Sequence, residues 1–188
     1  MVQAAIDAGE DIGLLLNGTM IPAMSEVGER FSRNEIYVPE MLVAARAMQG
    51  GLNIIEPLLA GTGHEPIARV CIGSVKGDLH DIGKNLVAMM LKGAGFAVED
   101  LGMDVDVDGF EKAVAGGAQV VCLSALLTTT RDEMRTVINH FKGRDGVKIV
   151  VGGAVITQDY ADEIGADAFG RDASDAVRAV KRCLGIGP

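Results

Sequence analysis

The chain has 188 residues, of which 26 are acidic and 17 basic, and its net charge of −9 argues against a nucleic-acid partner held through phosphates. Its 48% hydrophobic residues and 25 glycines are typical of an α/β protein with a packed core and exclude a disordered chain. The three cysteines are far apart, and Cys71 and Cys122 fall in apolar runs where a small buried side chain is the expected role. No apolar run is long enough to span a bilayer, and the N-terminus lacks a signal-peptide pattern. We therefore expect a cytoplasmic protein that has no contact with a membrane.

The first 60 residues carry helical spacing of apolar side chains and no strand pattern. Four helices are predicted, at Glu10–Leu16, Thr19–Phe31, Val38–Met48 and Leu52–Leu59. Breaks are expected at Gly18, Asn34 and the pair Gly50-Gly51. Pro22 and Pro39 suit the first turn of a helix, because an N–H group there has no helical partner. Residues 1–60 are therefore predicted to form a small helical bundle.

Residues 61–66 contain two glycines and a proline and predict a linker, after which residues 67–188 alternate between strand and helix patterns. Five strands are expected, at Ala68–Val75, Ala97–Leu101, Gln119–Leu126, Lys148–Val151 and Ala168–Gly170. The helices between and after them are expected at Ile82–Leu91, Gly109–Ala115, Asp132–Phe141, Thr157–Ile164 and Ala173–Leu184. This alternation favours parallel strands joined by right-handed crossovers. The predicted fold class is α/β, with a flavodoxin-like (Rossmann-like) doubly wound five-stranded sheet behind the helical bundle.

A histidine lies in the loop between the first predicted strand and the helix that follows it. The loop contains the pattern Asp78-x-His80-x-x-Gly83. In open α/β sheets such loops lie at the carboxyl ends of the strands, where ligands bind. A histidine with a carboxylate two residues before it suits a metal ligand whose second ring nitrogen is held by the acid. The alternative for this pattern alone is a helix-capping Asp78, a surface His80 and a packing Gly83.

Two further patterns end predicted strands at the same edge of the sheet: Ser124-x-Leu126 and Gly152-Gly153. Forty residues separate Gly83 from Ser124, and 25 separate Leu126 from Gly152. The ordered set, with these spacings, resembles the signature of cobalamin-binding domains of the methionine synthase type. The residues around His80 also resemble the corrinoid methyl-carrier proteins of multi-component methyltransferase systems. The resemblance covers nearly the whole chain.

The resemblance implies cobalamin as the cofactor, bound base-off, with His80 replacing the nucleotide base as the lower axial ligand of cobalt. Asp78 matches the histidine's partner in this family, and Thr130 falls where the family has a third, hydroxyl-bearing member of the ligand relay. A threonine keeps the hydroxyl donor and adds a methyl group. Neutral imidazole is a suitable cobalt ligand, and the relay would tune how readily a methyl group leaves the metal.

Further contacts are implied for the corrin and its nucleotide tail. Glycines at this edge leave room for the nucleotide tail. Ser124 would hydrogen-bond the base of the tail, and the Leu126 side chain would line the pocket that holds it. The expected cofactor-binding residues of the sheet domain are Gly77, Asp78, His80, Asp81, Ile82, Gly83, Ser124, Leu126, Thr128, Thr130, Gly152, Gly153, Phe169 and Gly170. Asp81 and Lys84 are as well suited to cap and solvate the helix start as to contact the cofactor.

The N-terminal bundle resembles the helical cap that covers the upper face of the corrin in this family. Carried over by position, the cap contacts would be Phe31, Val38 and Met41. The alternative is that these three are ordinary bundle core, since an apolar stripe on a helix usually packs. Compared with the family's bundle, this one resembles a bundle without the first helix. An exposed apolar groove is therefore expected, and self-association into a homo-oligomer would cover it.

The resemblance predicts a methyl carrier that serves two enzymes. A substrate:corrinoid methyltransferase would load the methyl group, a corrinoid:pterin or corrinoid:thiol methyltransferase would remove it, and a reductive activase would restore the cobalt. Three alternatives remain open: the small cobalamin-binding subunit of an adenosylcobalamin-dependent mutase, a cobalamin-dependent sensor, and a flavodoxin-like domain without a corrinoid. The cap bundle argues against the mutase, and the chain has no room for a sensor's output module.

Overall fold

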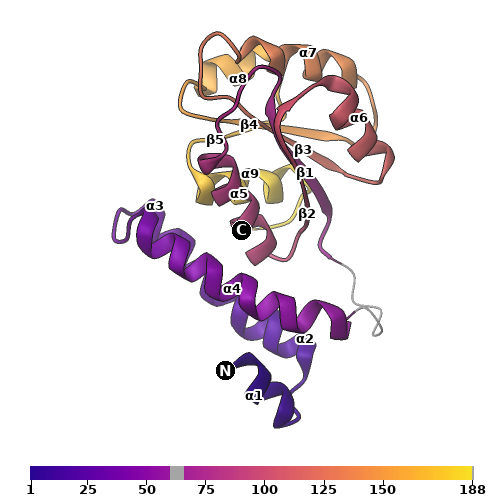
Figure 1. Ribbon diagram of the computed structural model, residues 1–188. Helices are drawn as coiled ribbons and strands as arrows, with labels where there is room; N and C mark the ends of the chain where they lie inside the picture. The colour runs from indigo at the N-terminus through magenta and orange to yellow at the C-terminus, as the bar shows by residue number, and fades with distance from the viewer. Residues whose placement is uncertain (60–65, 188) are drawn as a thin grey trace.

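The computed structural model describes residues 1–59 and 66–187, and the chain begins with helices and continues as an α/β unit (Figure 1). The N-terminal elements are α1 (Val2–Asp7), α2 (Ile12–Leu14), the π-helical turn η1 (Leu15–Met20), α3 (Ile21–Ser32) and α4 (Val38–Leu59). The helical character of this part is confirmed, and α1 is an addition to the predicted helices. Asn34 separates α3 from α4 with a φ of 59°, as the predicted break requires.

Two predicted helix breaks are wrong. Gly18 lies inside η1, which joins α2 to α3 without interruption, and Gly50-Gly51 lies inside the 22-residue helix α4. A Cβ on Gly51 would come within 2.5 Å of Met20 Cε and 3.2 Å of Val2 Cγ2. Gly51 therefore allows close packing of α4 against the preceding helices, and the resulting tertiary contacts outweigh the low helix propensity of glycine.

The sheet has five parallel strands in the order β2-β1-β3-β4-β5, which confirms the predicted flavodoxin-like topology. The strands are β1 (Arg69–Val75), β2 (Ala97–Val105), β3 (Val120–Ser124), β4 (Lys148–Gly152) and β5 (Ala168–Gly170). The helices are α5 (Ile82–Gly93), α6 (Val107–Ala115), α7 (Asp132–Phe141), α8 (Gln158–Ile164) and α9 (Ala173–Cys183). The strand β2 extends to Val105, four residues beyond its predicted end.

Helices cover both faces of the sheet, because alternate residues of the central strands point to opposite sides. In β3, Val120 and Cys122 join the apolar cluster of α5 and α9, whereas Val121 and Leu123 join that of α6, α7 and α8. Figure 1 shows these two helical layers on either side of the sheet. Since the apolar faces of both helical layers are buried against it, the sheet is held rigidly and its carboxyl edge presents a fixed set of loops.

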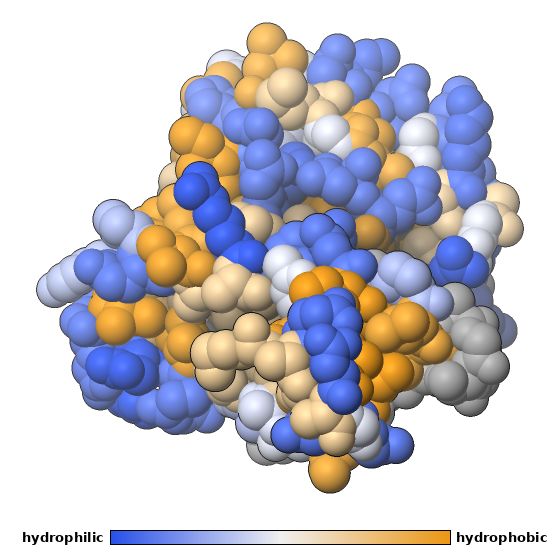
Figure 2. All heavy atoms as spheres, turned by 60° about the horizontal axis from the view of Figure 1, so that its bottom comes forward, coloured by the Kyte–Doolittle hydropathy of each residue, from blue (hydrophilic) through white to orange (hydrophobic). Residues whose placement is uncertain are grey.

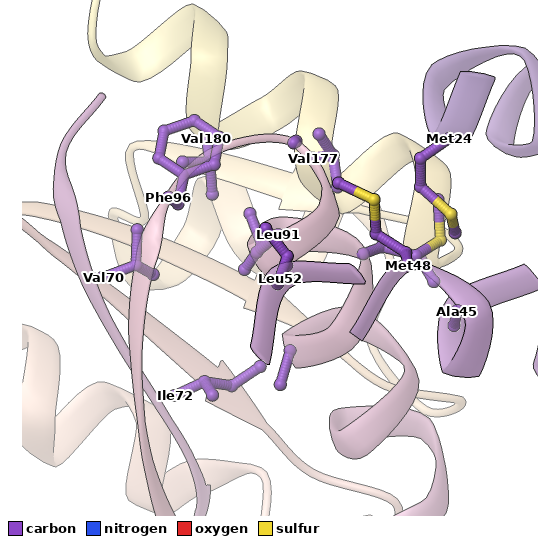
Figure 3. Packing of buried hydrophobic residues seen from close by; sticks show 14 of the residues in the cluster. Met24, Ala45, Met48, Leu52, Val70, Ile72, Leu91, Phe96, Val177 and Val180 are labelled. Carbon is purple, nitrogen blue, oxygen red and sulfur yellow. The ribbon is translucent and has the colours of Figure 1, made fainter. Parts of the chain in front are cut away.

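The N-terminal helices share one apolar cluster with the α5–α9 layer. Figure 3 shows Met24 of α3 and Met48 and Leu52 of α4 beside Leu91 of α5 and Val177 of α9. Of these side chains, Leu91 is fully buried. The two parts of the chain therefore pack as one hydrophobic unit in this arrangement. Residues 61–65 of the predicted linker lie outside the described residues.

Several large apolar side chains of the N-terminal helices face solvent. Leu14 and Val43 are each 68% exposed, and Leu58 is 44% exposed. Figure 2, which looks onto these helices, shows apolar side chains gathered on this face. Within residues 1–59 and 66–187, no helix has the length and apolar character needed to cross a membrane.

We predict that Leu91→Ala lowers the free energy of unfolding by about 2–5 kcal/mol, because it leaves a cavity in the cluster that joins the helices to the sheet. Urea titration followed by circular dichroism measures this loss. Leu14→Ala removes the same atoms from an exposed position and is the control, with an expected change of less than about 0.5 kcal/mol. Equal losses in the two variants would contradict the shared core.

Candidate functional site

The loop between β1 and α5 carries Asp78 and His80 at the carboxyl edge of the sheet. It turns immediately after β1, where the Asp78 N–H donates to the Val75 carbonyl at 3.0 Å. Gly77 has a φ of 80°, a left-handed conformation that glycine adopts without the steric cost of a side chain. The turn directs the Asp78 side chain inward, and the loop ends at Asp81, the N-cap position of α5.

Asp78 is fully buried and its carboxylate accepts four hydrogen bonds. Oδ2 accepts from the Leu126 N–H at 2.8 Å and from the Thr130 hydroxyl at 2.7 Å. Oδ1 accepts from the His80 N–H at 3.0 Å and lies 2.8 Å from His80 Nδ1. Burial raises the pKa of the Asp78 carboxyl, but the hydrogen bonds from Thr130, Leu126 and His80 outweigh burial and hold that pKa well below its usual range. Asp78 is therefore a carboxylate and not a helix cap.

The hydrogen bond to Asp78 fixes the tautomer of His80. A carboxylate can only accept, so Nδ1 carries a proton, and in the neutral imidazole Nε2 keeps a free lone pair. The His80 side chain is 48% exposed and lines a cavity of about 650 Å³. A neutral imidazole held in this way, with one nitrogen available, is the arrangement that a metal-ligating histidine requires.

The cavity next to His80 extends from the β1–α5 loop along the face of the sheet that α5 and α9 cover. Its walls include Ile72 of β1, Cys122 of β3, Val150 of β4 and Ala176 of α9, with Ser124 as a polar group. Burial raises the pKa of the Cys122 thiol well above its usual range, so this thiol stays protonated and forms part of the apolar wall. The volume falls in the range of small-molecule and cofactor sites.

Glycines shape the site in two different ways. A Cβ on Gly83 would meet no heavy atom within 4 Å, so this glycine leaves empty space on the cavity side of α5. A Cβ on Gly153 would collide with the Ala125 backbone, and one on Gly170 would lie 2.7 Å from Ala176 Cα. Gly153 and Gly170 let backbone segments approach one another, whereas Gly83 leaves room for a ligand.

The structure brings together most of the residues that the sequence predicted for the site. The cavity is lined by Phe31, His80, Asp81, Ile82, Gly83, Ser124, Leu126, Gly152, Gly153 and Gly170. Asp78 and Thr130 lie behind His80 and complete the predicted relay geometry. Leu126 lines the cavity, and its backbone N–H also donates a hydrogen bond to Asp78.

Apart from Asp78 and Thr130, five predicted contact residues do not line this cavity. Gly77 and Thr128 are exposed elsewhere on the loops, and Phe169 packs against the α6–α8 cluster. Val38 is 42% exposed, and Met41 is fully buried among the apolar residues shared by α4 and the sheet. Met41 is thus core in this arrangement, because its position on α4 faces the shared apolar cluster.

Other residues of the site were missed or misjudged from sequence. Lys84 was expected either at a solvated helix start or in contact with the cofactor. Its side chain is 1% exposed and lines the cavity, and its ammonium lies 2.5 Å from Asp100 Oδ1 and 2.6 Å from Asn85 Oδ1. Ile72, Cys122 and Val150 were assigned only to strands. Nothing in an apolar strand pattern distinguishes a residue that lines a cavity from one that packs against a helix.

Comparison with known proteins identifies the family. Residues 68–181 match a family model described as a B12 binding domain, and residues 1–56 match a second model with the same description. The chain belongs to the corrinoid protein family. It is 43% identical to the trimethylamine corrinoid protein of Methanosarcina barkeri over 97% of this chain and 87% of that protein. It is 44% identical to dimethylamine corrinoid protein 3 of Methanosarcina mazei over 86% of this chain and 99% of that protein.

Solved structures of corrinoid proteins have the same fold. A cobalamin-binding protein from Desulfitobacterium hafniense matches with a TM-score of 0.80 and 29% identity, over 97% of this chain and 88% of that one. The methanol:cobalamin methyltransferase complex of Methanosarcina barkeri contains a chain that matches with a TM-score of 0.85 and 29% identity, over 98% of this chain and 72% of that one. The cofactor of the family is cobalamin, as predicted.

The site of this corrinoid protein fits that cofactor. Imidazole nitrogen is a suitable cobalt ligand, and His80 Nε2 is left free for this role by the Asp78 hydrogen bond. The cavity beside it extends between the sheet and the α5–α9 layer, and Gly83 leaves space in its wall, as a nucleotide tail would need. When bound, the corrin supplies a cobalt centre that can hold a methyl group.

We predict that Asp78→Asn lowers the free energy of unfolding at pH 7 by about 1–3 kcal/mol, because an amide cannot accept hydrogen bonds at both of its positions. The folded-state pKa of Asp78 is lowered, so its stabilisation is complete above the unfolded value of about 4 and is lost as pH falls toward the folded value. The difference between parent and variant should therefore shrink in urea titrations from pH 5 to pH 3. A difference that grows on acidification would contradict this assignment.

Proposed function

We propose that this corrinoid protein carries a methyl group between two methyltransferases, with His80 as the lower axial ligand of cobalt and the cofactor bound base-off. The observation that carries the proposal is the His80 imidazole, fixed by Asp78 at 2.8 Å and directed to a cavity of about 650 Å³. Thr130 donates to Asp78 at 2.7 Å and completes a relay. The relay holds the proton on Nδ1 and keeps Nε2 basic.

The proposal extends to the partner enzymes. A substrate:corrinoid methyltransferase loads the methyl group, and a second methyltransferase removes it to a pterin or thiol acceptor. Identities of 43% and 44% to proteins named for trimethylamine and dimethylamine support a methylated amine as the donor. A reductive activase restores cobalt that has been oxidised. The chain itself supplies the ligand, the relay and the cofactor slot.

The proposal also covers how the chain is organised and where it acts. We assign residues 1–60 to a helical cap, 61–66 to a linker and 67–188 to the cobalamin-binding domain. Phe31 already lines the cavity and Val38 is exposed, whereas a contact from Met41 to the corrin requires α4 to move from the shared apolar cluster. Exposed Leu14 and Val43 provide an apolar surface for self-association. Three free cysteines suit the reducing cytoplasm.

We predict that the parent protein binds cobalamin with a visible spectrum of histidine-coordinated cobalt and that His80→Ala binds it with a base-off spectrum. The alanine removes the only ligand that the proposal assigns to the lower face. Absorption spectra of both proteins after reconstitution and desalting measure the change. A parent protein that retains no cobalamin, or an alanine variant with the parent's spectrum, would overturn the proposed ligand.

We predict that Gly83→Leu weakens cobalamin binding at least about tenfold, because the new side chain enters the empty cavity side of α5. Stability of the cofactor-free protein should change by less than about 1 kcal/mol, since a Cβ there meets no protein atom. Gly50→Leu in α4, where a Cβ also meets nothing within 4 Å, is the matched control and should bind normally. Equilibrium dialysis against cobalamin compares the three proteins, and equal affinities would show that Gly83 does not border the cofactor.

A further inference from the structure

Two side chains outside the Asp78–Thr130 relay also hold the loop of His80. Ser74, the penultimate residue of β1, is fully buried, and its hydroxyl donates to the His80 backbone carbonyl at 2.6 Å. Asp104, near the end of β2, accepts from the Gly77 N–H at 2.7 Å. The Asp104 N–H donates to the Asp78 carbonyl at 3.1 Å. The loop is thus held on both sides of the Asp78–His80 pair.

Asp104 reaches the loop because β2 bulges next to it. Gly73 pairs with Gly102 and Val75 pairs with Val105, so Met103 and Asp104 together lie opposite the single residue Ser74. Asp104 has a φ of 54°, which is uncommon for a residue with a side chain and is tolerated best by asparagine and aspartate. Bulges of this kind re-aim a residue away from the strand ladder. Here the bulge turns both the backbone N–H and the carboxylate of Asp104 to the loop.

Packing alone does not fix the His80 side chain. The His80 side chain is 48% exposed, and the flanking Leu79 and Ile82 are 69% and 78% exposed. The direction of the imidazole therefore depends on the Asp78 hydrogen bond and on the backbone positions of the loop. Ser74 fixes the position of the His80 carbonyl. Asp104 fixes the positions of the Asp78 carbonyl and the Gly77 N–H.

We propose that Ser74 and Asp104 are positioning residues that keep His80 directed at the cofactor side of the loop. Neither touches the cofactor site itself; they act through the backbone of Gly77, Asp78 and His80. This inference rests on the proposed role of His80 as the cobalt ligand. In this arrangement Asp78 orients the His80 ring. Ser74 and Asp104, from the two strands, hold the backbone of the loop that carries Asp78 and His80.

The test compares Asp104→Gly with Asp104→Asn and Ser74→Ala with Ser174→Ala. Asp104→Gly accepts the positive φ but removes the carboxylate, whereas Asp104→Asn keeps both a side-chain oxygen and tolerance of that φ. Ser174 is buried in α9 and bonds to Arg178, so its alanine variant controls for loss of a buried hydroxyl away from the loop.

The first readout uses the protein without cofactor. Nitrogen–proton spectra of the histidine side chains should show His80 as the Nδ1–H tautomer in the parent, Asp104→Asn and Ser174→Ala. In Asp104→Gly and Ser74→Ala we expect a mixture of tautomers. The second readout is the visible spectrum after reconstitution with cobalamin, where the ratio of histidine-bound to base-off cofactor should fall about tenfold in the same two variants.

The two hypotheses can fail separately. If Asp104→Gly and Ser74→Ala lower the unfolding midpoint but keep the parent's tautomer and spectral ratio, the two residues only stabilise the fold and the inference is wrong. If the parent binds no cobalamin, the proposed function fails, and the tautomer spectra still decide whether Ser74 and Asp104 hold the imidazole. If Ser74→Ala does not fold, the comparison of Asp104→Gly with Asp104→Asn still tests the inference.

Discussion

The site depends on one buried carboxylate. Asp78 has no contact with solvent and is charged, which is tolerated only because four hydrogen bonds reach its two oxygens. Those donors come from the β1–α5 loop and from the segment after β3, so the charge ties two loops together. The same carboxylate orients His80 and leaves Nε2 free. Loss of this interaction would therefore affect the fold of the loops and the direction of the imidazole at once.

The sheet topology explains why these two loops meet. In the order β2-β1-β3-β4-β5 the chain leaves β1 toward β2 on one side and enters β3 on the other. The carboxyl ends of β1 and β3 are neighbours at this switch point, and their loops diverge to leave a crevice. Asp78 and His80 follow β1, while Leu126 and Thr130 follow β3. The apolar cavity opens between them, as cofactor sites in such sheets do.

Sequence alone could predict the elements that depend on local pattern. The five strands, the helices between them and the edge that carries Asp78, His80 and Ser124 follow from apolar periodicity and strand ends. It could not predict that α4 passes through Gly50-Gly51, because that depends on close contacts with Met20. A core position for Met41 was one of the two predicted alternatives, but the burial of Lys84 and the direction of the Asp104 side chain escaped prediction. Each is set by tertiary packing or by a β-bulge, which no local pattern encodes.

The central claim is that a nitrogen of His80 binds cobalt, and paramagnetic resonance of the cobalt(II) form tests it most directly. Protein reconstituted with cobalamin is prepared with ¹⁴N-histidine and again with ¹⁵N-histidine. Coordination by His80 predicts cobalt lines split into three by ¹⁴N and into two by ¹⁵N, with neither pattern in His80→Ala. Splitting that stays threefold under ¹⁵N labelling would show that the ligand nitrogen belongs to the cofactor's own base, and the account of this site would be wrong.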